Sequence, residues 1–225
     1  MIDGHGTWSD LAELRQGLYR FFAGALLPPD AARVELLGAA AATLAESELD
    51  AFAFTPAWRA AAAIFEAPPP LGELEAEYAA LFVSAEGTGT CPPLEAHYGA
   101  APGRAPLVDT WLRHEYARLG LGLRPDLTVP SDHVSVQLEV MSSLCHDEAH
   151  AWADGRDADA TGIVRRQWTF LDRHLGRWVP LWASHVEHAT VAGPWSTIVA
   201  ATRAFVQHDI DLVTVLSRSS LVSSR

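Results

Sequence analysis

The chain of 225 residues contains no lysine, because all 16 of its basic residues are arginine. A P-loop needs a lysine to contact phosphate, so this class of nucleotide-binding site is excluded. Schiff-base chemistry and the anchoring of pyridoxal phosphate need a side-chain amine, so they are excluded as well.

Cysteine is also scarce, since the chain has only Cys91 and Cys145, which lie far apart and form no CxxC motif. Two such cysteines do not indicate a disulfide scaffold, which makes a reducing compartment the default expectation. The first ten residues, MIDGHGTWSD, lack the basic and apolar segments of a secretory signal, and no apolar run is long enough to span a bilayer. We therefore expect a cytoplasmic protein without membrane insertion.

Basic charge is low relative to acidic charge, with 16 basic against 28 acidic residues and a net charge of −12. An acidic surface repels phosphate backbones and anionic lipids, so nucleic acid and membrane surfaces are poor partners. The same surface would attract a basic segment of another protein.

Long alternating apolar and polar runs are missing too, and alanine and leucine dominate the composition. This pattern predicts an all-α protein, and the length suits one domain with a substantial core. We predict a single-domain bundle of about eight to ten helices over residues 1–216, followed by a disordered polar tail at 217–225.

The predicted helices follow from apolar periodicity and from helix start and stop signals. The first begins at Ser9 or Asp10, after a frayed segment 1–8, with a capping box formed by Asp10 and Glu13. The second runs over about 30–48, the third begins at Pro56, and the fourth ends at residue 82. The next two run over about 107–119 and from Ser131 to about 153. The last two run from beyond 155 to 186, with a kink at Pro180, and from Pro194 onward, with Val215 buried. Residues 86–106 are expected to form the longest ordered loop.

One candidate functional stretch is EYAALFVSAEGTGTCPPLEAHY, residues 77–98. It begins as a helix with an apolar face at Tyr78, Leu81 and Phe82, and then breaks at a Gly-rich loop and at the pair Pro92-Pro93. Glu95 and Tyr98 follow three residues apart. The stretch could form the wall of a groove, or it could be a loop between two helices with Tyr98 packed beneath it.

A second candidate stretch is VPSDHVSVQLEVM, residues 129–141, in which Asp132 and His133 are predicted in the first turn of a helix. The dipole at a helix N-terminus favours an ionised aspartate and a neutral imidazole. Together they would offer a donor and acceptors to a peptide or ligand. The alternative is that Asp132 only caps the helix while His133 is solvated.

The segment HDEAH places His146 and His150 at i and i+4, which is a spacing that can share a metal ion. Asp147 stands where metalloproteases have glutamate, and a third ligand would have to come from elsewhere, with His185 and His188 the neighbouring pair. We interpret the segment as an exposed polar face and predict no metal site. No GxSxG motif supports nucleophilic catalysis either, so we predict no catalytic residues.

Taken together, the two stretches resemble the TorD/NarJ family of redox-enzyme maturation chaperones. The resemblance rests on YxxLF, a Gly-rich loop and PPxExxY, followed about 35 residues later by PxDHxxxxLExM. The matching residues are Tyr78, Leu81, Phe82, Pro92, Pro93, Glu95, Tyr98, Pro130, Asp132, His133, Leu138, Glu139 and Met141. Ala96 and Val129 depart from the serine and glutamate that are common there. The run from GAAPGRAP into WLRHEYARLGLGL is most similar to chaperones of periplasmic type II enzymes.

The resemblance implies a cytoplasmic, helical, non-enzymatic chaperone without a cofactor of its own. It would bind the twin-arginine leader of an immature catalytic subunit, from a molybdoenzyme of the dimethyl sulfoxide reductase family. It would assist insertion of the molybdenum cofactor and proofread the subunit before export. We expect a monomer, with a dimer as the alternative. The rival hypotheses are a helical metal-dependent hydrolase using HDEAH and a non-catalytic oxidoreductase subunit.

The residues implied in client binding divide into three groups. Glu95 and Asp132 would accept hydrogen bonds from the guanidinium groups of the leader. His133 would orient Asp132 or bond the peptide backbone. An apolar wall would be formed by Tyr78, Leu81, Phe82, Pro92, Pro93 and Tyr98.

Overall fold

The computed structural model describes residues 4–47, 49–83, 90–99, 105–123, 128–189 and 193–222. Within these ranges the chain forms ten helices and no strand, which confirms the predicted all-α class. No helix in the described part is long and apolar enough to cross a membrane. The helices are α1 (Gly4–Ala25), α2 (Ala31–Ala45), α3 (Thr55–Glu66), α4 (Leu71–Phe82), α5 (Glu95–Tyr98), α6 (Ala105–Arg118), α7 (Val134–Ala153), α8 (Asp157–Arg173), α9 (Leu175–Ala189) and α10 (Pro194–Val222).

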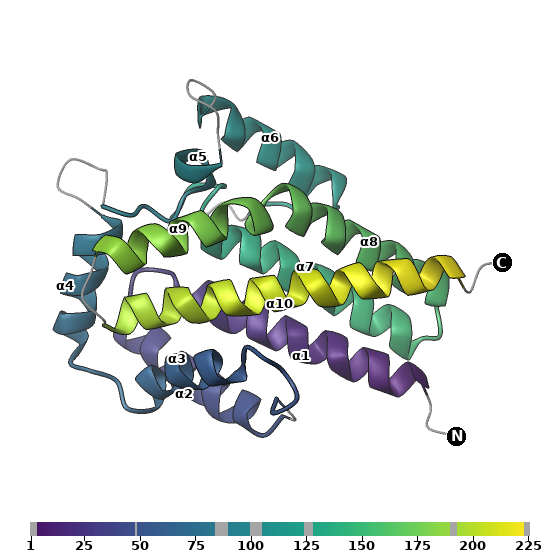
Figure 1. The fold of residues 1–225 in the computed structure, drawn as a ribbon, viewed down its shortest axis with the longest axis horizontal. Coiled ribbons are helices and arrows are strands. Elements are labelled where there is room, and N and C mark those ends of the chain that lie inside the picture. The colour runs from purple at the N-terminus through teal and green to yellow at the C-terminus, as the bar shows by residue number, and fades with distance from the viewer. Residues whose placement is uncertain are drawn as a thin grey trace.

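The long helices form the body of the molecule, and the short α5 with α6 lies at one edge (Figure 1). Helix α1 packs along α7, which also contacts α8, while α10 lies against α3, α8 and α9. The core between them is rich in aromatic side chains. The largest fully buried ones are Trp58, Trp178, Trp182, Trp195, Tyr19, Tyr116, Phe21, Phe22, Phe170 and Phe205.

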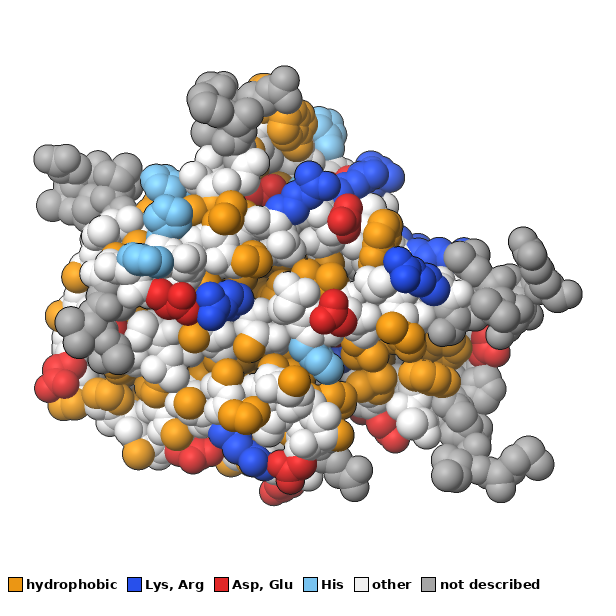
Figure 2. All heavy atoms as spheres, in the orientation of Figure 1, with side chains coloured by type: hydrophobic (Ala, Val, Ile, Leu, Met, Phe, Trp, Pro, Cys, Tyr) orange, Lys and Arg blue, Asp and Glu red, His pale blue; other side chains and the backbone are white. Residues whose placement is uncertain are grey.

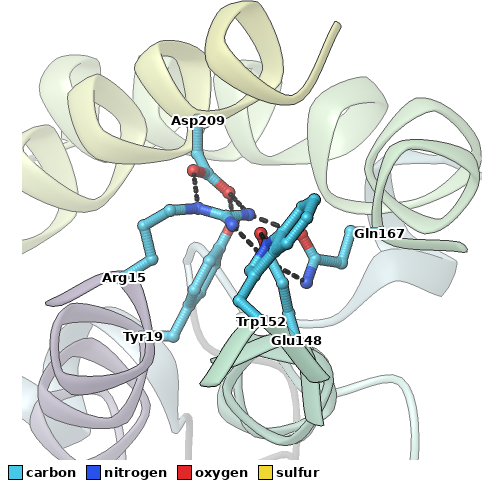
Figure 3. Close-up of polar contacts among 6 residues, drawn as sticks. All are labelled: Arg15, Tyr19, Glu148, Trp152, Gln167 and Asp209. Atoms are coloured by element: carbon cyan, nitrogen blue, oxygen red, sulfur yellow. Dashed lines mark hydrogen bonds and ion pairs between the residues drawn. The ribbon is translucent and has the colours of Figure 1, made fainter. Parts of the chain in front are cut away.

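A buried polar network ties α1 to three other helices (Figure 3). The guanidinium of Arg15 donates to Asp209 on α10, to Glu148 on α7 and to Gln167 on α8, with each of these distances 2.6 Å. The hydroxyl of Tyr19 also donates to Asp209 at 2.6 Å. Because a buried charge needs nearby partners, this network fixes how the four helices fit together.

Helix α1 begins at Gly4, so the predicted start at Ser9 or Asp10 and its capping box are wrong. The first turns of α1 contact residues of α7, and these contacts cannot be predicted from the sequence of α1 alone. The ring of Trp8 lies 6.4 Å from that of Trp152, and the Ser9 hydroxyl donates to the carbonyl of Ala149 at 3.0 Å. These contacts stabilise the helix beyond its local start signal.

The single long helix predicted from 155 to 186 is in fact two helices, and the break lies at His174 rather than at Pro180. His174 has a non-helical backbone, with φ −123° and ψ −98°. A Cβ on Gly176 would lie 2.8 Å from the carbonyl oxygen of Leu171, so glycine permits the close approach of the two helix ends. Pro180 lies inside α9.

The last helix begins at Pro194 as predicted, but Val215 is 61% exposed instead of buried. The helix continues to Val222 and so includes the first part of the segment 217–225, which was expected to be a disordered tail. Residues 223–225 lie outside the described residues. Of the loop expected at 86–106, residues 86–89 and 100–104 also lie outside them, and α5 occupies part of the remainder.

Candidate functional site

The two candidate stretches meet at an isolated antiparallel bridge between Leu94 and His133. The backbone N–H of Glu95 donates to the carbonyl of Asp132 at 3.1 Å, and that of Val134 donates to the carbonyl of Pro93 at 2.9 Å. A diproline favours an extended path, which allows the first stretch to run beside the second. The two motifs therefore form one structural unit.

Asp132 caps the short helix α5 rather than the helix that follows it in sequence. Its Oδ2 accepts a hydrogen bond from the backbone N–H of Ala96 at 3.1 Å. The side chain is buried, and this burial raises the pKa of the carboxyl group, while the hydrogen bond from Ala96 opposes the rise. Asp132 therefore joins the start of α7 to α5.

His133 is the residue that caps α7, which begins at Val134, so the predicted helix start at Ser131 is wrong. Its Nδ1 accepts a hydrogen bond from the backbone N–H of Ser135 at 3.1 Å, which places the proton of the neutral ring on Nε2. Burial lowers the pKa of His133 to about 4. The ring is thus neutral as predicted, but because of burial rather than the helix dipole, and the solvated alternative is wrong. Ser131 instead donates its hydroxyl to Asp109.

The carboxylate of Glu95 is held from two sides by residues outside the predicted set. Gln137 Nε2 donates to Glu95 Oε2 at 2.6 Å, and His174 Nδ1 lies 3.1 Å from both carboxylate oxygens. Gln137 in turn accepts a hydrogen bond from Trp178 Nε1 at 3.0 Å. Sequence reasoning missed these three partners. The available signal was Gln137, a polar residue four positions after His133 and four before Met141 on a buried stripe.

The apolar residues of the first stretch lie in the core. Tyr78, Leu81 and Phe82 are each 5% exposed, and the rings of Tyr78 and Phe82 contact Trp195 at 5.0 and 6.0 Å. The Tyr78 hydroxyl donates to the carbonyl of Leu26 at 3.3 Å. In this structure the three residues therefore do not form the exposed wall that was predicted, because the short helix α4 needs its one apolar face for packing.

The remaining wall residues are not freely exposed either. Pro92 and Pro93 are buried, and Tyr98 is half-buried. The ring of Tyr98 stacks on Trp178 with centroids 6.0 Å apart, and it lies 5.3 Å from the ring of His185. Tyr98 thus connects α5 to α9.

Comparison with known proteins identifies the family. Residues 36–184 match the family model described as "Nitrate reductase delta subunit". The chain belongs to this family, which includes the TorD/NarJ redox-enzyme maturation chaperones. The family membership confirms the predicted class, an assembly chaperone for molybdoenzyme maturation rather than an enzyme.

Individual relatives agree with the family. The chain is 33% identical to the chlorate reductase assembly chaperone protein of Ideonella dechloratans, over 64% of this chain and 74% of that protein. It is 35% identical to the selenate reductase assembly chaperone protein of Thauera selenatis, over 51% of this chain and 58% of that protein. A chaperone protein TorD from Photobacterium profundum is 27% identical, over 61% and 62% of the two chains.

The fold also has a solved counterpart. A crystal structure of a redox enzyme maturation protein from Archaeoglobus fulgidus superimposes with a TM-score of 0.51, covering 85% of this chain and 93% of that one. The sequence identity is 22%, so this likeness shows the fold alone.

The two helices that contact α5 in this TorD/NarJ chain carry exposed apolar side chains. Helix α5 packs on both α6 and α9. Trp111 on α6 is 51% exposed and Leu181 on α9 is 49% exposed, and His97 and His185 are exposed as well. On the face shown in Figure 2, acidic and basic side chains are scattered among hydrophobic ones, so the acidic excess does not gather there in one patch.

The HDEAH segment of this TorD/NarJ chain presents its two histidines on the surface of α7. The rings of His146 and His150 lie 4.2 Å apart, and both side chains and Asp147 are exposed. Glu148 points inward to Arg15. Among the described residues, no group of three or more His, Cys, Asp or Glu could hold a metal ion.

Proposed function

We propose that this chaperone binds the twin-arginine leader of a molybdoenzyme catalytic subunit in the cytoplasm. It holds the precursor until the molybdenum cofactor has been inserted, and then releases it for export. The named relatives serve chlorate and selenate reductases, which supports a client of the same type II class. The observation that carries the proposal is the backbone hydrogen bond from Glu95 to Asp132, next to the bridge between Leu94 and His133, which brings the two carboxylate-bearing residues into one unit.

The chemistry of this unit suits an arginine-containing peptide. A carboxylate can accept two parallel hydrogen bonds from a guanidinium, and such charge-assisted bonds are roughly twice as strong as neutral ones. Glu95 and Asp132 are both largely buried, so a bound arginine would interact with them where water screens little. His133 follows Asp132 directly in the chain, and its neutral ring caps α7 by accepting from the N–H of Ser135.

The apolar part of the leader would lie on surface that the sequence motifs do not include. Trp111 on α6 and Leu181 on α9 provide exposed apolar groups on the two helices that pack against α5. The motif residues are packed inside the protein instead: Tyr98 stacks on Trp178, Tyr78, Leu81 and Phe82 lie in the core, and Pro92 and Pro93 are buried.

Release requires moderate affinity, because the client must leave once it is mature. No motif for nucleotide hydrolysis is present to drive release, so folding of the client would have to weaken its binding. A permanent oxidoreductase subunit would instead co-purify with the mature exported enzyme. Pull-down from the native cytoplasm distinguishes the two, since a chaperone captures only the immature precursor.

The binding site is tested by calorimetry with a synthetic peptide that carries two adjacent arginines and a leucine- and alanine-rich stretch. We expect Glu95→Gln to weaken binding about tenfold, because the neutral amide loses the charge-assisted pair. Glu187→Gln is the matched control, since Glu187 is an exposed glutamate of α9 paired with Arg203. Equal affinity of the wild type and Glu95→Gln would place the site elsewhere.

A further inference from the structure

The Glu95 carboxylate has no oxygen without a partner in the free protein. Oε2 accepts from Gln137 at 2.6 Å, and both oxygens lie 3.1 Å from His174 Nδ1. A carboxylate has about four lone-pair sites, so a guanidinium that binds both oxygens competes with the donors already there. The competition is most direct with the His174 nitrogen, because it is equidistant from the two oxygens.

Gln137 is not a donor that can leave. It is fully buried, and its own carbonyl accepts from the indole of Trp178, which is fully buried as well. Turning the Gln137 amide away would break two hydrogen bonds and leave the Trp178 indole without an acceptor in the core, which is costly.

His174 is the donor that can move. It lies at the break between α8 and α9, and its side chain is 14% exposed. Its backbone is anchored independently, because its N–H donates to the carbonyl of Phe170 at 3.0 Å and its carbonyl accepts from Arg177 at 2.9 Å. The imidazole lies 4.8 Å from the ring of Phe170, so rotation of the side chain disturbs one ring contact and no core hydrogen bond of Gln137.

We propose that His174 is an affinity-determining residue of the client site, which occupies Glu95 in the free chaperone and is displaced by the client's arginine. This inference rests on the proposed function, because it assumes that Glu95 receives the arginine. The competing histidine lowers the affinity for the leader and gives the moderate binding that release requires. It also keeps the carboxylate hydrogen-bonded when no client is present.

The test is a double-mutant cycle, measured by calorimetry with the synthetic two-arginine peptide. We expect His174→Ala to bind about tenfold more tightly than the wild type, because the competing hydrogen bond to a charged group is gone. His174→Gln retains an N–H donor and should keep the wild-type affinity. In the Glu95→Gln background, His174→Ala should change nothing, because the residue acts only through Glu95. His188→Ala is the matched control, since His188 is an exposed histidine of α9 whose Nδ1 contacts its own helix.

Two results would overturn the proposal. Weaker or unchanged binding by His174→Ala would show that the histidine supports the site or has no part in it. Equal tightening in the wild-type and Glu95→Gln backgrounds would show that it acts by another route. In either case Glu95→Gln would still weaken binding, so the proposed function would stand. If the wild type bound no peptide, both proposals would fail together.

A measurement on the unmodified protein covers the case in which His174→Ala does not fold. The imidazole nitrogen signals of His174, observed by nuclear magnetic resonance, should shift when the peptide is added to the wild type. They should not shift on addition of a peptide with both arginines replaced by glutamine. Signals that stay fixed while the peptide binds would contradict displacement.

Discussion

The backbone N–H of Glu95 donates to the carbonyl oxygen of Asp132, which makes the first residue of α5 depend on the segment that precedes α7. A second contact strengthens the link, because the Asp132 carboxylate accepts from the N–H of Ala96. A helix of four residues has little stability of its own, so these contacts from the segment before α7 help to determine where α5 lies. A substitution in either motif is therefore expected to change the structure of the other motif as well.

The first prediction concerns the charge of Asp132. Burial raises the pKa of its carboxyl group in the folded protein, so its contribution to stability is greatest below the unfolded pKa and is lost as the pH rises through the folded value. Asp132→Asn keeps an oxygen that can accept from Ala96 and removes the buried charge. We expect this variant to be at least as stable as the wild type at pH 7, with the difference shrinking at acidic pH, in urea unfolding. Lower stability of Asp132→Asn at pH 7 would contradict this prediction, because it would show that hydrogen-bond partners fully offset the cost of burying the charge. Asp211→Asn is the control, since Asp211 is an exposed residue of α10.

The second prediction concerns His133, whose pKa burial lowers to about 4. Above the unfolded pKa near 6.5 both states are neutral; as the pH falls toward 4, the unfolded chain takes up a proton that the folded protein does not. Stability is therefore lost across this window, by at most about 3 kcal/mol.

His133→Asn removes this titration and retains a side-chain oxygen that can accept from Ser135 at the start of α7. In urea unfolding between pH 7 and pH 4.5, we expect the variant to lose clearly less stability than the wild type. His188→Asn, an exposed histidine on α9, should keep the wild-type slope. An unchanged slope in His133→Asn would mean that the folded protein admits the proton at His133.

Most of the fold could be predicted from the sequence because its signals are local. Apolar spacing and the caps are sufficient for α2, where Asp30 accepts from the N–H of Arg33 at 2.8 Å as an N-cap does, and for α6, which ends before Gly120 at φ +78°. The start of α1 and the break at His174 depend on contacts with distant segments. Neither feature can therefore be predicted from the sequence of the helices concerned.

The site was predictable in part for the same reason. The resemblance assigns Glu95 and Asp132 to one client site, which stays a prediction, and the bridge between Leu94 and His133 shows that their two segments are adjacent. Periodicity could not tell whether the apolar face of α4 meets a client or the core, because the two demand the same side chains. His174 is in neither motif and reaches Glu95 only through the turn between α8 and α9.

The third prediction concerns the buried network of Arg15. Arg15→Met would leave Asp209 and Glu148 buried without their cation, which typically costs about 3–5 kcal/mol in the free energy of unfolding. Urea unfolding measures this loss. Arg59→Met breaks an exposed pair with Asp50 and should lose at most about 1 kcal/mol. Similar small losses in both variants would contradict a central role for the network.

The fourth prediction concerns the hydroxyl of Tyr98, which is buried and has no hydrogen-bond partner among the described residues. Burial also raises the pKa of this phenol. Tyr98→Phe keeps the stacking on Trp178 and removes a desolvated polar group, so we expect stability equal to the wild type or up to about 1 kcal/mol higher.

Tyr116→Phe provides the matched comparison, because the Tyr116 hydroxyl donates to the carbonyl of Ser131 at 2.7 Å. Its loss should cost about 1 kcal/mol, since the buried carbonyl then lacks that donor. If the Tyr98 hydroxyl is used by the client, Tyr98→Phe should also weaken binding of the two-arginine peptide several-fold while its stability is retained. A buried polar group without a partner needs such an explanation, and a ligand that supplies the missing acceptor is one. If Tyr98→Phe is destabilised as strongly as Tyr116→Phe, the Tyr98 hydroxyl has a partner within the protein. That result would contradict a role for this hydroxyl in client binding.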